Sequence, residues 1–130
     1  MKIVALVQAR MGSSRLPGKV LKLIDGRPMI ELLLSRLSKS IKLDDILVAA
    51  SEEQKNDKLQ SVIESIGYKC SRGSEKDVLN RFYESARSVD ADVIVRITGD
   101  CPLVDPKMVD ECIKKYLDSN VCLLYTSDAA

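Results

Sequence analysis

Three cationic side chains stand in one short connection near the start of the chain, at residues 8–19. This segment reads QARMGSSRLPGK and combines Arg10, Arg15 and Lys19 with two glycines and two serine hydroxyls. It follows an apolar run over residues 3–7, which predicts a buried strand. Because glycine permits close backbone approach and N–H groups, Arg and Lys neutralise anions, the segment predicts a triphosphate-binding loop at the end of a parallel strand. The alternative is a solvated basic loop, since Gly, Ser and Pro are common in loops.

Two better-known phosphate motifs do not match this segment. A Walker A loop has Gly, four residues, Gly, Lys and then Ser or Thr, whereas Gly12 and Gly18 are too far apart and Val20 follows Lys19. The dinucleotide pattern G-x-G-x-x-G is also absent from the sequence. We therefore predict a different kind of nucleotide loop, in which side-chain cations do more of the binding.

A carboxylate follows a second predicted strand, in the segment RITGDCPLVDP at residues 96–106. Asp100 comes just after the apolar stretch 92–98 and a glycine that permits a sharp turn. A carboxylate at that edge of a sheet suits Mg²⁺ that bridges phosphate oxygens. The alternative is a turn aspartate without a ligand, but a cationic loop across the sheet favours the metal-binding interpretation.

A third segment, RGSEKDVLNR at residues 72–81, carries both helix-start signals and arginines. Ser74 and Asp77 fit a variant of the capping box, so a structural role explains them. Arg72 or Arg81 could instead reach the nucleotide or an acidic sugar. For Arg81 the two interpretations stay open.

The composition of the 130-residue chain excludes several kinds of chemistry. There is no histidine, which removes Ser-His-Asp and Cys-His catalysis and histidine zinc sites. Cys101 beside the acidic motif is therefore expected to pack rather than react. A net charge of +1 and five aromatic residues give no support to nucleic-acid binding. With no signal peptide and no membrane-length apolar run visible, we expect a cytoplasmic protein that does not bind membranes.

Strand and helix patterns alternate along the chain, which predicts an α/β fold with a mainly parallel sheet covered on both faces, a three-layer sandwich. In such sheets, ligands bind outside the carboxyl ends of the strands. Four loops are expected to meet there as one site, at residues 8–19, 51–54, 71–75 and 98–105. The expected strands are 2–8, 45–50, 68–71 and 92–98, and the expected helices are 28–38, 51–66, 74–88 and 106–117.

Capping residues and buried faces follow from the same patterns. Ser51 with Gln54 predicts a capping box, Ser74 is expected to cap the third helix, and Asp105 the last one, before Pro106. Lys55 is expected on the solvated surface. The third helix is predicted to turn its apolar side chains inward, namely Val78, Leu79, Phe82, Tyr83 and Ala86.

In their order, the three motifs, with DGRPMI at residues 25–30, resemble the cytidylyltransferase family. That family includes the enzymes that make CMP-3-deoxy-manno-octulosonate and CMP-sialic acid, and the chain is most similar to the branch of spore coat polysaccharide biosynthesis protein F. The resemblance covers residues 2 to about 120. It implies a glycosyltransferase-A-like, Rossmann-like nucleotidyltransferase fold. It also implies that a hydroxyl of an acidic sugar, of the 2-keto-3-deoxy type, attacks the α-phosphorus of CTP and expels pyrophosphate, for surface or spore coat polysaccharide.

The resemblance also implies roles at matching positions. Arg10 and Lys19 would grip the triphosphate with Ser14 and Arg15 assisting, Asp100 would hold Mg²⁺, and backbone at residues 7–9 would border the cytosine. The expected catalytic residues are Arg10, Lys19 and Asp100, and the expected nucleotide-binding residues are Gln8, Ala9, Arg10, Gly12, Ser13, Ser14, Arg15, Lys19, Arg81 and Thr98.

The family's later half usually supplies a second metal carboxylate, part of the sugar pocket and a dimer-forming segment. These would lie beyond residue 121, so residues 1–121 are expected to be the N-terminal part of one domain of a protein that could form homodimers. Residues 122–130, CLLYTSDAA, match the translation of a transposon adapter used in DNA library preparation and are interpreted as a sequencing artefact. Two alternatives stay open: a non-catalytic nucleotide-binding module or inactive fragment, and a related nucleotidyltransferase that uses another nucleoside triphosphate.

Overall fold

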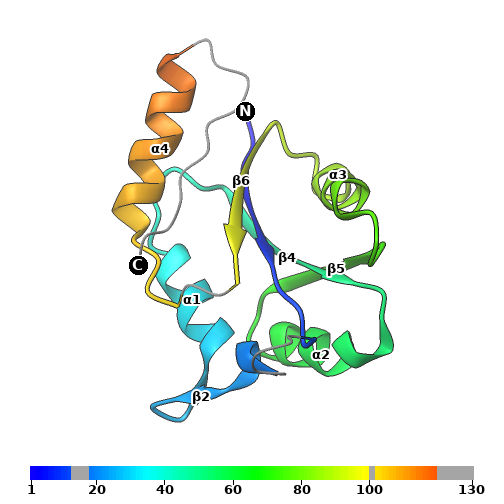
Figure 1. The fold of residues 1–130 in the computed structure, drawn as a ribbon. Coiled ribbons are helices and arrows are strands. Elements are labelled where there is room, and N and C mark those ends of the chain that lie inside the picture. The colour runs from blue at the N-terminus through cyan, green and yellow to red at the C-terminus, as the bar shows by residue number, and fades with distance from the viewer. Residues whose placement is uncertain (13–17, 100–101, 120–130) are drawn as a thin grey trace.

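A four-stranded parallel sheet forms the centre of the computed structural model, which describes residues 1–12, 18–99 and 102–119 (Figure 1). Its strands are β1 (Ile3–Gln8), β4 (Asp45–Ser51), β5 (Lys69–Gly73) and β6 (Val93–Thr98), in the order β5-β4-β1-β6. From β1 the chain adds strands on one side and then returns to add β6 on the other. The strand order therefore reverses between β1 and β6, and the crevice outside the carboxyl ends of such a pair is where ligands bind in open parallel sheets.

Four α-helices cover the two faces of this sheet in the described part of the chain, as the alternating pattern predicted (Figure 1). The helices α1 (Met29–Leu37), α2 (Asp57–Ser65) and α4 (Pro106–Asp118) share one apolar core. The remaining helix, α3 (Val78–Ser88), packs on the opposite face. The predicted layered α/β architecture is thus confirmed.

The first strand is apolar at consecutive positions because both of its faces are covered. Ala5 and Val7 contribute to the core under α1, α2 and α4, whereas Val4 and Leu6 contribute to the core under α3. All four side chains are fully buried. A parallel strand buried on both faces shows this continuous run in place of the alternation of a half-exposed strand.

Short elements connect β1 to α1 and were not among the predicted ones. A 3-10 helix, η1 (Lys19–Leu21), precedes a small hairpin of β2 (Leu23–Ile24) and β3 (Arg27–Pro28). Its two-residue turn has positive φ at both Asp25 (51°) and Gly26 (80°). Asp-Gly favours this type I′ geometry, so the sequence carried a hairpin signal there.

The predicted helix caps Ser51 and Ser74 are wrong, because Ser51 belongs to strand β4 and Ser74 lies in the turn before α3. Strand β4 continues through Ser51, a 3-10 helix η2 (Gln54–Asn56) follows, and α2 starts only at residue 57, so Ser51 caps no helix. Helix α3 begins at Val78 rather than at residue 74, and its N-cap is Asp77, whose side chain accepts a 3.0 Å hydrogen bond from Asn80 N. The hydroxyl of Ser74 instead accepts a hydrogen bond from Asp77 N. The predicted cap of α4 is confirmed: Asp105 accepts from Lys107 N, with proline in the first turn.

The predicted inner face of α3 is also partly wrong. Leu79 and Tyr83 are 81% and 60% exposed, whereas Arg81, Ser85 and Ala86 are buried. Polar contacts to β5 set this rotation: the hydroxyls of Ser85 and Ser71 lie 2.6 Å apart. Helix α3 therefore covers β1, β4 and β5 and leaves alternate side chains of β6, such as Ile94, exposed.

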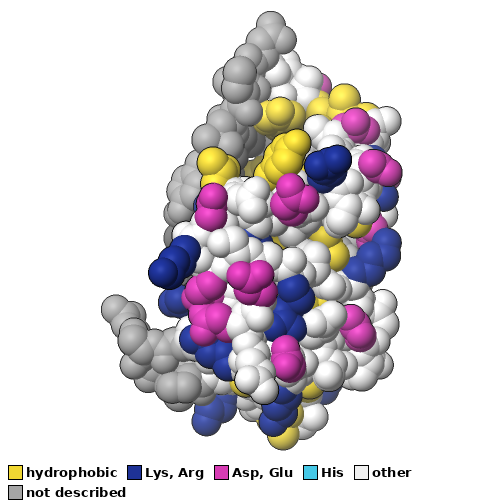
Figure 2. Space-filling view, turned by 90° about the vertical axis from the view of Figure 1, so that its right-hand side faces the viewer, with side chains coloured by type: hydrophobic (Ala, Val, Ile, Leu, Met, Phe, Trp, Pro, Cys, Tyr) yellow, Lys and Arg dark blue, Asp and Glu magenta, His cyan; other side chains and the backbone are white. Residues whose placement is uncertain are grey.

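Charges of both signs are mixed over the side of the molecule that carries α2 and α3 (Figure 2). The described residues on this face show Lys and Arg interspersed with Asp and Glu, without an extended basic surface. Within the ranges that the structure describes, no helix is long and apolar enough to cross a membrane.

Candidate functional site

The segments predicted to form one site leave the same edge of the sheet. Gln8 at the end of β1 is paired in register with Thr98 at the end of β6, and Ser51 at the end of β4 is paired with Gly73 at the end of β5. The structure therefore brings the backbone at residues 8–12, 51–56, 73–77 and 98–99 to one edge. Ser13, Ser14, Arg15, Asp100 and Cys101 lie outside the described residues.

A close approach of backbone fixes the ends of β1 and β6. The N–H of Gly99 donates a 2.7 Å hydrogen bond to the carbonyl of Gln8, and Ala9 N donates to Ala49 O at 3.4 Å. Ala9 is buried, so the strand end is fixed from both neighbours. The backbone expected to border a nucleobase is thus firmly placed, which a base-reading role requires.

The cationic segment is held at both of its ends. Gly18 N donates a 2.8 Å hydrogen bond to Met11 O, and Gly18 adopts a left-handed conformation with φ of 73°. Lys19 then starts η1, which is anchored by the buried Val20. Arg10 is exposed and Lys19 partly exposed. Two of the predicted cations therefore flank a closed loop at the strand edge, where an anion can reach them.

Gly12 touches a lysine that the sequence analysis placed on the solvated surface. A Cβ atom at residue 12 would lie 2.5 Å from Lys55 Nζ, and Lys55 pairs with Glu53 at 3.0 Å. The Lys55 side chain is 49% exposed, so it is solvated and also adjacent to the loop. A side chain at residue 12 would displace the flexible end of Lys55, so the contact does not by itself require glycine.

Arg72 is fully engaged by protein groups. Its guanidinium donates to Ser51 O at 2.5 Å, to Glu53 O at 2.7 Å and to Gln60 Oε1 at 2.8 Å, and it pairs with Asp57 at 3.0 Å. These contacts tie β5 to the connection between β4 and α2. The structure therefore supports the structural interpretation of Arg72.

Arg81 differs, because one of its buried nitrogen atoms has no partner among the described residues. The residue is only 6% exposed, and its NH1 group donates to Ser74 O at 3.3 Å, whereas Nε makes no hydrogen bond in the described part of the chain. Its Cγ packs against Gly73, where an added Cβ would lie 2.9 Å away. A buried donor without a partner is costly, so Arg81 Nε is a candidate donor to a ligand.

Thr98 is exposed beside Gln8, whose side-chain oxygen accepts a 2.8 Å hydrogen bond from Arg96. The Arg96 guanidinium also lies over the Phe82 ring, 5.0 Å from its centroid. A cation–π contact of this kind stabilises by roughly 0.5–1 kcal/mol at an exposed site. Arg96 thus orients Gln8 at the strand edge.

The donor set for a divalent metal rests on Asp100, which the structure does not describe. No group of three acidic or cysteine side chains that could hold a metal occurs among the described residues. Mg²⁺ in phosphate-transfer sites uses one or two carboxylates together with substrate phosphates. Gly99, the residue before the predicted ligand Asp100, is fixed beside Gln8 by its hydrogen bond.

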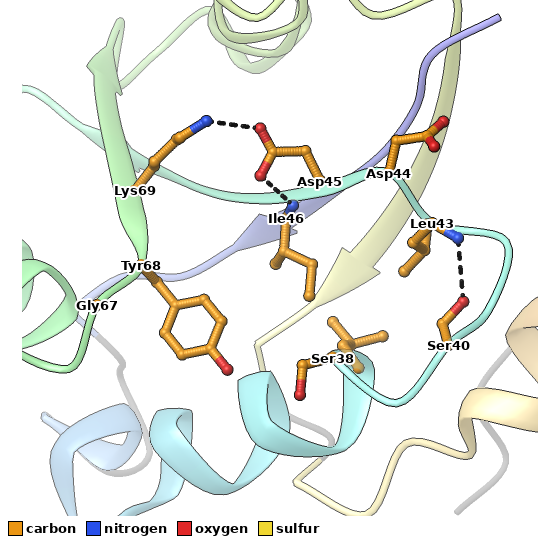
Figure 3. A pocket seen from close by; sticks show the side chains of 10 residues that line it. Ser38, Ser40, Leu43, Asp44, Asp45, Ile46, Gly67, Tyr68 and Lys69 are labelled. Carbon is orange, nitrogen blue, oxygen red and sulfur yellow. Dashed lines mark hydrogen bonds and ion pairs between the residues drawn. The ribbon is translucent and has the colours of Figure 1, made fainter.

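A cavity formed by described residues lies at the opposite edge, where β4 and β5 begin (Figure 3). It measures about 290 Å³, is lined by both apolar and polar residues, and its charged side chains pair with protein groups. Lys69 Nζ donates to Asp45 at 2.7 Å, and Asp44 accepts from Ile3 N. Burial acts to raise the pKa of Asp45, but hydrogen bonds from Lys69 and Ile46 N outweigh it, so the pKa lies below its ordinary value. We therefore infer that Asp44, Asp45 and Lys69 stabilise the fold rather than bind a ligand.

A parallel sheet whose strand order reverses between β1 and β6 is the arrangement at which open α/β domains bind ligands. The chain belongs to the cytidylyltransferase family, whose sequence profile matches residues 4–129. It is 46% identical over 120 residues to MJ1063 of Methanocaldococcus jannaschii, covering 92% of this chain and 49% of that protein. The spore coat polysaccharide biosynthesis protein SpsF of Bacillus subtilis is 36% identical over 131 residues, with 98% and 55% covered. The 3-deoxy-manno-octulosonate cytidylyltransferase of Pelobacter propionicus is 35% identical over 120 residues, with 91% and 46% covered.

Solved structures show the same fold. A cytidylyltransferase from Leptospira borgpetersenii superimposes with a TM-score of 0.86 at 37% identity, covering 92% of this chain and 50% of that one. A CMP:2-keto-3-deoxy-manno-octonic acid synthetase complexed with CTP gives a TM-score of 0.81 at 28% identity, with 91% and 48% covered. The expected family and nucleotidyltransferase fold are thus confirmed, and the chain spans about half the length of these relatives.

Proposed function

We propose that the complete protein transfers CMP from CTP to a hydroxyl of an acidic sugar and releases pyrophosphate. The observation that carries this proposal is the pair of cations Arg10 and Lys19, which flank the Gly18–Met11 hydrogen bond at the strand edge of a cytidylyltransferase-family chain. Relatives that are named for 3-deoxy-manno-octulosonate and for spore coat polysaccharide support a sugar acid of the 2-keto-3-deoxy type and a role in surface polysaccharide synthesis.

In this proposal the loop binds the triphosphate, with Arg10 and Lys19 as its principal cations and Ser13, Ser14 and Arg15 within the loop. The sugar hydroxyl forms a bond to the α-phosphorus, the bond from that phosphorus to the β-phosphate oxygen breaks, and the hydroxyl proton is lost to water. Negative charge moves onto pyrophosphate during this step. Preorganised cations at the leaving group stabilise that charge more in the transition state than in the ground state.

The remaining assigned residues place the nucleotide. Backbone of Gln8 and Ala9 would border the cytosine, and the guanidinium of Arg81, whose Nε makes no hydrogen bond to the described residues, would turn to donate to the nucleoside. Thr98 and Gly12 would line the same edge of the sheet. Asp100 would hold Mg²⁺, which would neutralise phosphate charge when bound. Holding the reactants in line supplies much of the acceleration in phosphoryl-transfer chemistry.

The test uses the protein produced from its complete gene. Pyrophosphate release is measured with CTP, UTP, GTP or ATP, each with 3-deoxy-manno-octulosonate, sialic acid or no sugar. We expect release that requires CTP and one sugar acid, with a CMP-sugar as the second product. Preference for another triphosphate would indicate a different nucleotidyltransferase, and CTP binding without turnover on any acid would favour the non-catalytic module.

A further inference from the structure

Asn56 joins the cationic loop to the end of β4 through a fully buried side chain. Its Oδ1 accepts a 2.9 Å hydrogen bond from the N–H of Met11, which lies 45 residues earlier in the chain. Its Nδ2 donates to Ser51 at 2.7 Å to the hydroxyl and 3.4 Å to the carbonyl. Both ends of the amide are therefore satisfied, and they bridge two segments of the strand edge.

The Asn56 side chain does not point toward the backbone of α2, as an N-cap side chain usually does. Asn56 is the N-cap of α2, where an asparagine side chain usually accepts a hydrogen bond from the first turn of its own helix. Here the side chain makes no capping hydrogen bond. It is turned instead toward Met11 and Ser51, so the contact to the loop replaces a local stabilising contact.

Met11 is held by both of its backbone polar groups. The Met11 N–H donates to Asn56 Oδ1, and the Met11 carbonyl accepts a hydrogen bond from Gly18 N. On the same side, Lys55 packs against Gly12. The first residues of the loop are thus fixed in direction by η2 before any ligand arrives.

We propose that Asn56 is a positioning residue, which fixes the start of the phosphate-binding loop by holding the backbone N–H of Met11. The inference rests on the proposed function for its consequence, which is tighter binding of the triphosphate. It predicts that loss of the Asn56 amide releases the Met11 N–H and weakens binding of CTP more than binding of cytidine, because cytidine lacks the phosphates.

The experiment measures amide hydrogen exchange at Met11 without ligand, and CTP and cytidine dissociation constants, in the protein from its complete gene. For Asn56→Ala we expect Met11 exchange and the Kd for CTP to rise about tenfold each, with the cytidine Kd unchanged. Asn56→Asp keeps an acceptor for Met11 but loses the donor to Ser51, so it should keep more Met11 protection than Asn56→Ala. Ser85→Ala, which breaks the buried contact to Ser71 on the far side of β5, should leave all three readouts unchanged.

Undiminished Met11 protection in Asn56→Ala would overturn the inference. So would an equal loss of protection in Ser85→Ala, since that would mark a general loosening of the fold. Failure of the wild-type protein to bind any nucleoside triphosphate would overturn the proposed function instead, and the exchange at Met11 would still decide whether Asn56 holds the Met11 N–H.

Discussion

The N–H of Gly99 and the carbonyl of Gln8 form a 2.7 Å hydrogen bond, and a Cβ atom on residue 99 would lie 2.7 Å from the same oxygen. The contact joins the ends of β1 and β6 at the point where the strand order reverses. No larger residue fits there without a backbone shift. Gly99, which the sequence suggests for a sharp turn, is thus needed because the backbone of β1 leaves no space for a side chain.

Gly99→Ala should destabilise the protein, because the new methyl group meets fixed backbone rather than a flexible side chain. We expect a loss of about 1–3 kcal/mol in the free energy of unfolding, measured by urea denaturation. Thr98→Ala, at the exposed neighbouring position, serves as the control and should change stability by less than about 0.5 kcal/mol. Equal effects of the two substitutions would contradict the steric explanation.

Lys19→Ala should weaken CTP binding while leaving cytidine binding nearly unchanged, since the ammonium group is assigned to the phosphates. A lost charge-assisted hydrogen bond of about 1.5–3 kcal/mol corresponds to roughly a 10- to 150-fold rise in the dissociation constant. Calorimetric titration with both ligands measures it. Lys22→Ala removes an exposed lysine three residues away and should have little effect on either ligand. Parallel losses for CTP and cytidine would remove Lys19 from the phosphate site.

Asp100→Asn should abolish Mg²⁺-dependent pyrophosphate release and leave the circular dichroism spectrum unchanged. The amide keeps the size of the side chain but removes the charge that a hard cation prefers. Addition of EDTA to the wild-type protein should have the same effect, reversed by excess Mg²⁺. Asp90→Asn changes an exposed acid in a left-handed turn that asparagine tolerates, and it should keep full activity. Turnover of Asp100→Asn at the wild-type rate would refute the metal assignment.

Cys70 should react slowly with iodoacetamide in the folded protein. Burial in β5 raises the pKa of its thiol from about 9 to about 11, although Arg72 opposes the shift. The thiolate is the reactive form, and a two-unit rise leaves roughly one hundredth of the ordinary thiolate at pH 8. Mass spectrometry of the Cys70 peptide, with and without urea, measures this difference. Modification at the same rate in both conditions would show that the thiol is accessible and unshifted.

Periodicity predicted the sheet and its helices because both depend on runs of apolar side chains. The run at residues 3–7 is apolar at every position because its neighbours cover both faces, and each predicted strand and α-helix is present. Helices α2 and α3, however, begin at residues 57 and 78 rather than at the expected 51 and 74. The grouping of loops at one edge followed from parallel strand direction alone. Elements of two or three residues, such as η1 and β2, are too short to show a period.

Contacts between distant segments decided the details that the sequence did not predict. Ser51 and Ser74 have the local chemistry of caps, but the first is buried at the end of a longer strand and the second bonds within a turn. The exposed position of Leu79 follows from polar pairing between α3 and β5, which no helical period reveals. No local sequence pattern predicted the role of Asn56, because its hydrogen-bond partner Met11 is 45 residues away.

The hydrogen bond between Gly18 and Met11 also bears on how tightly a ligand can bind. Bringing the two ends of a flexible segment together costs conformational entropy. Here that entropy is lost when the protein folds, so it does not oppose ligand binding. A ligand that binds at this edge therefore does not have to bring Met11 and Gly18 together.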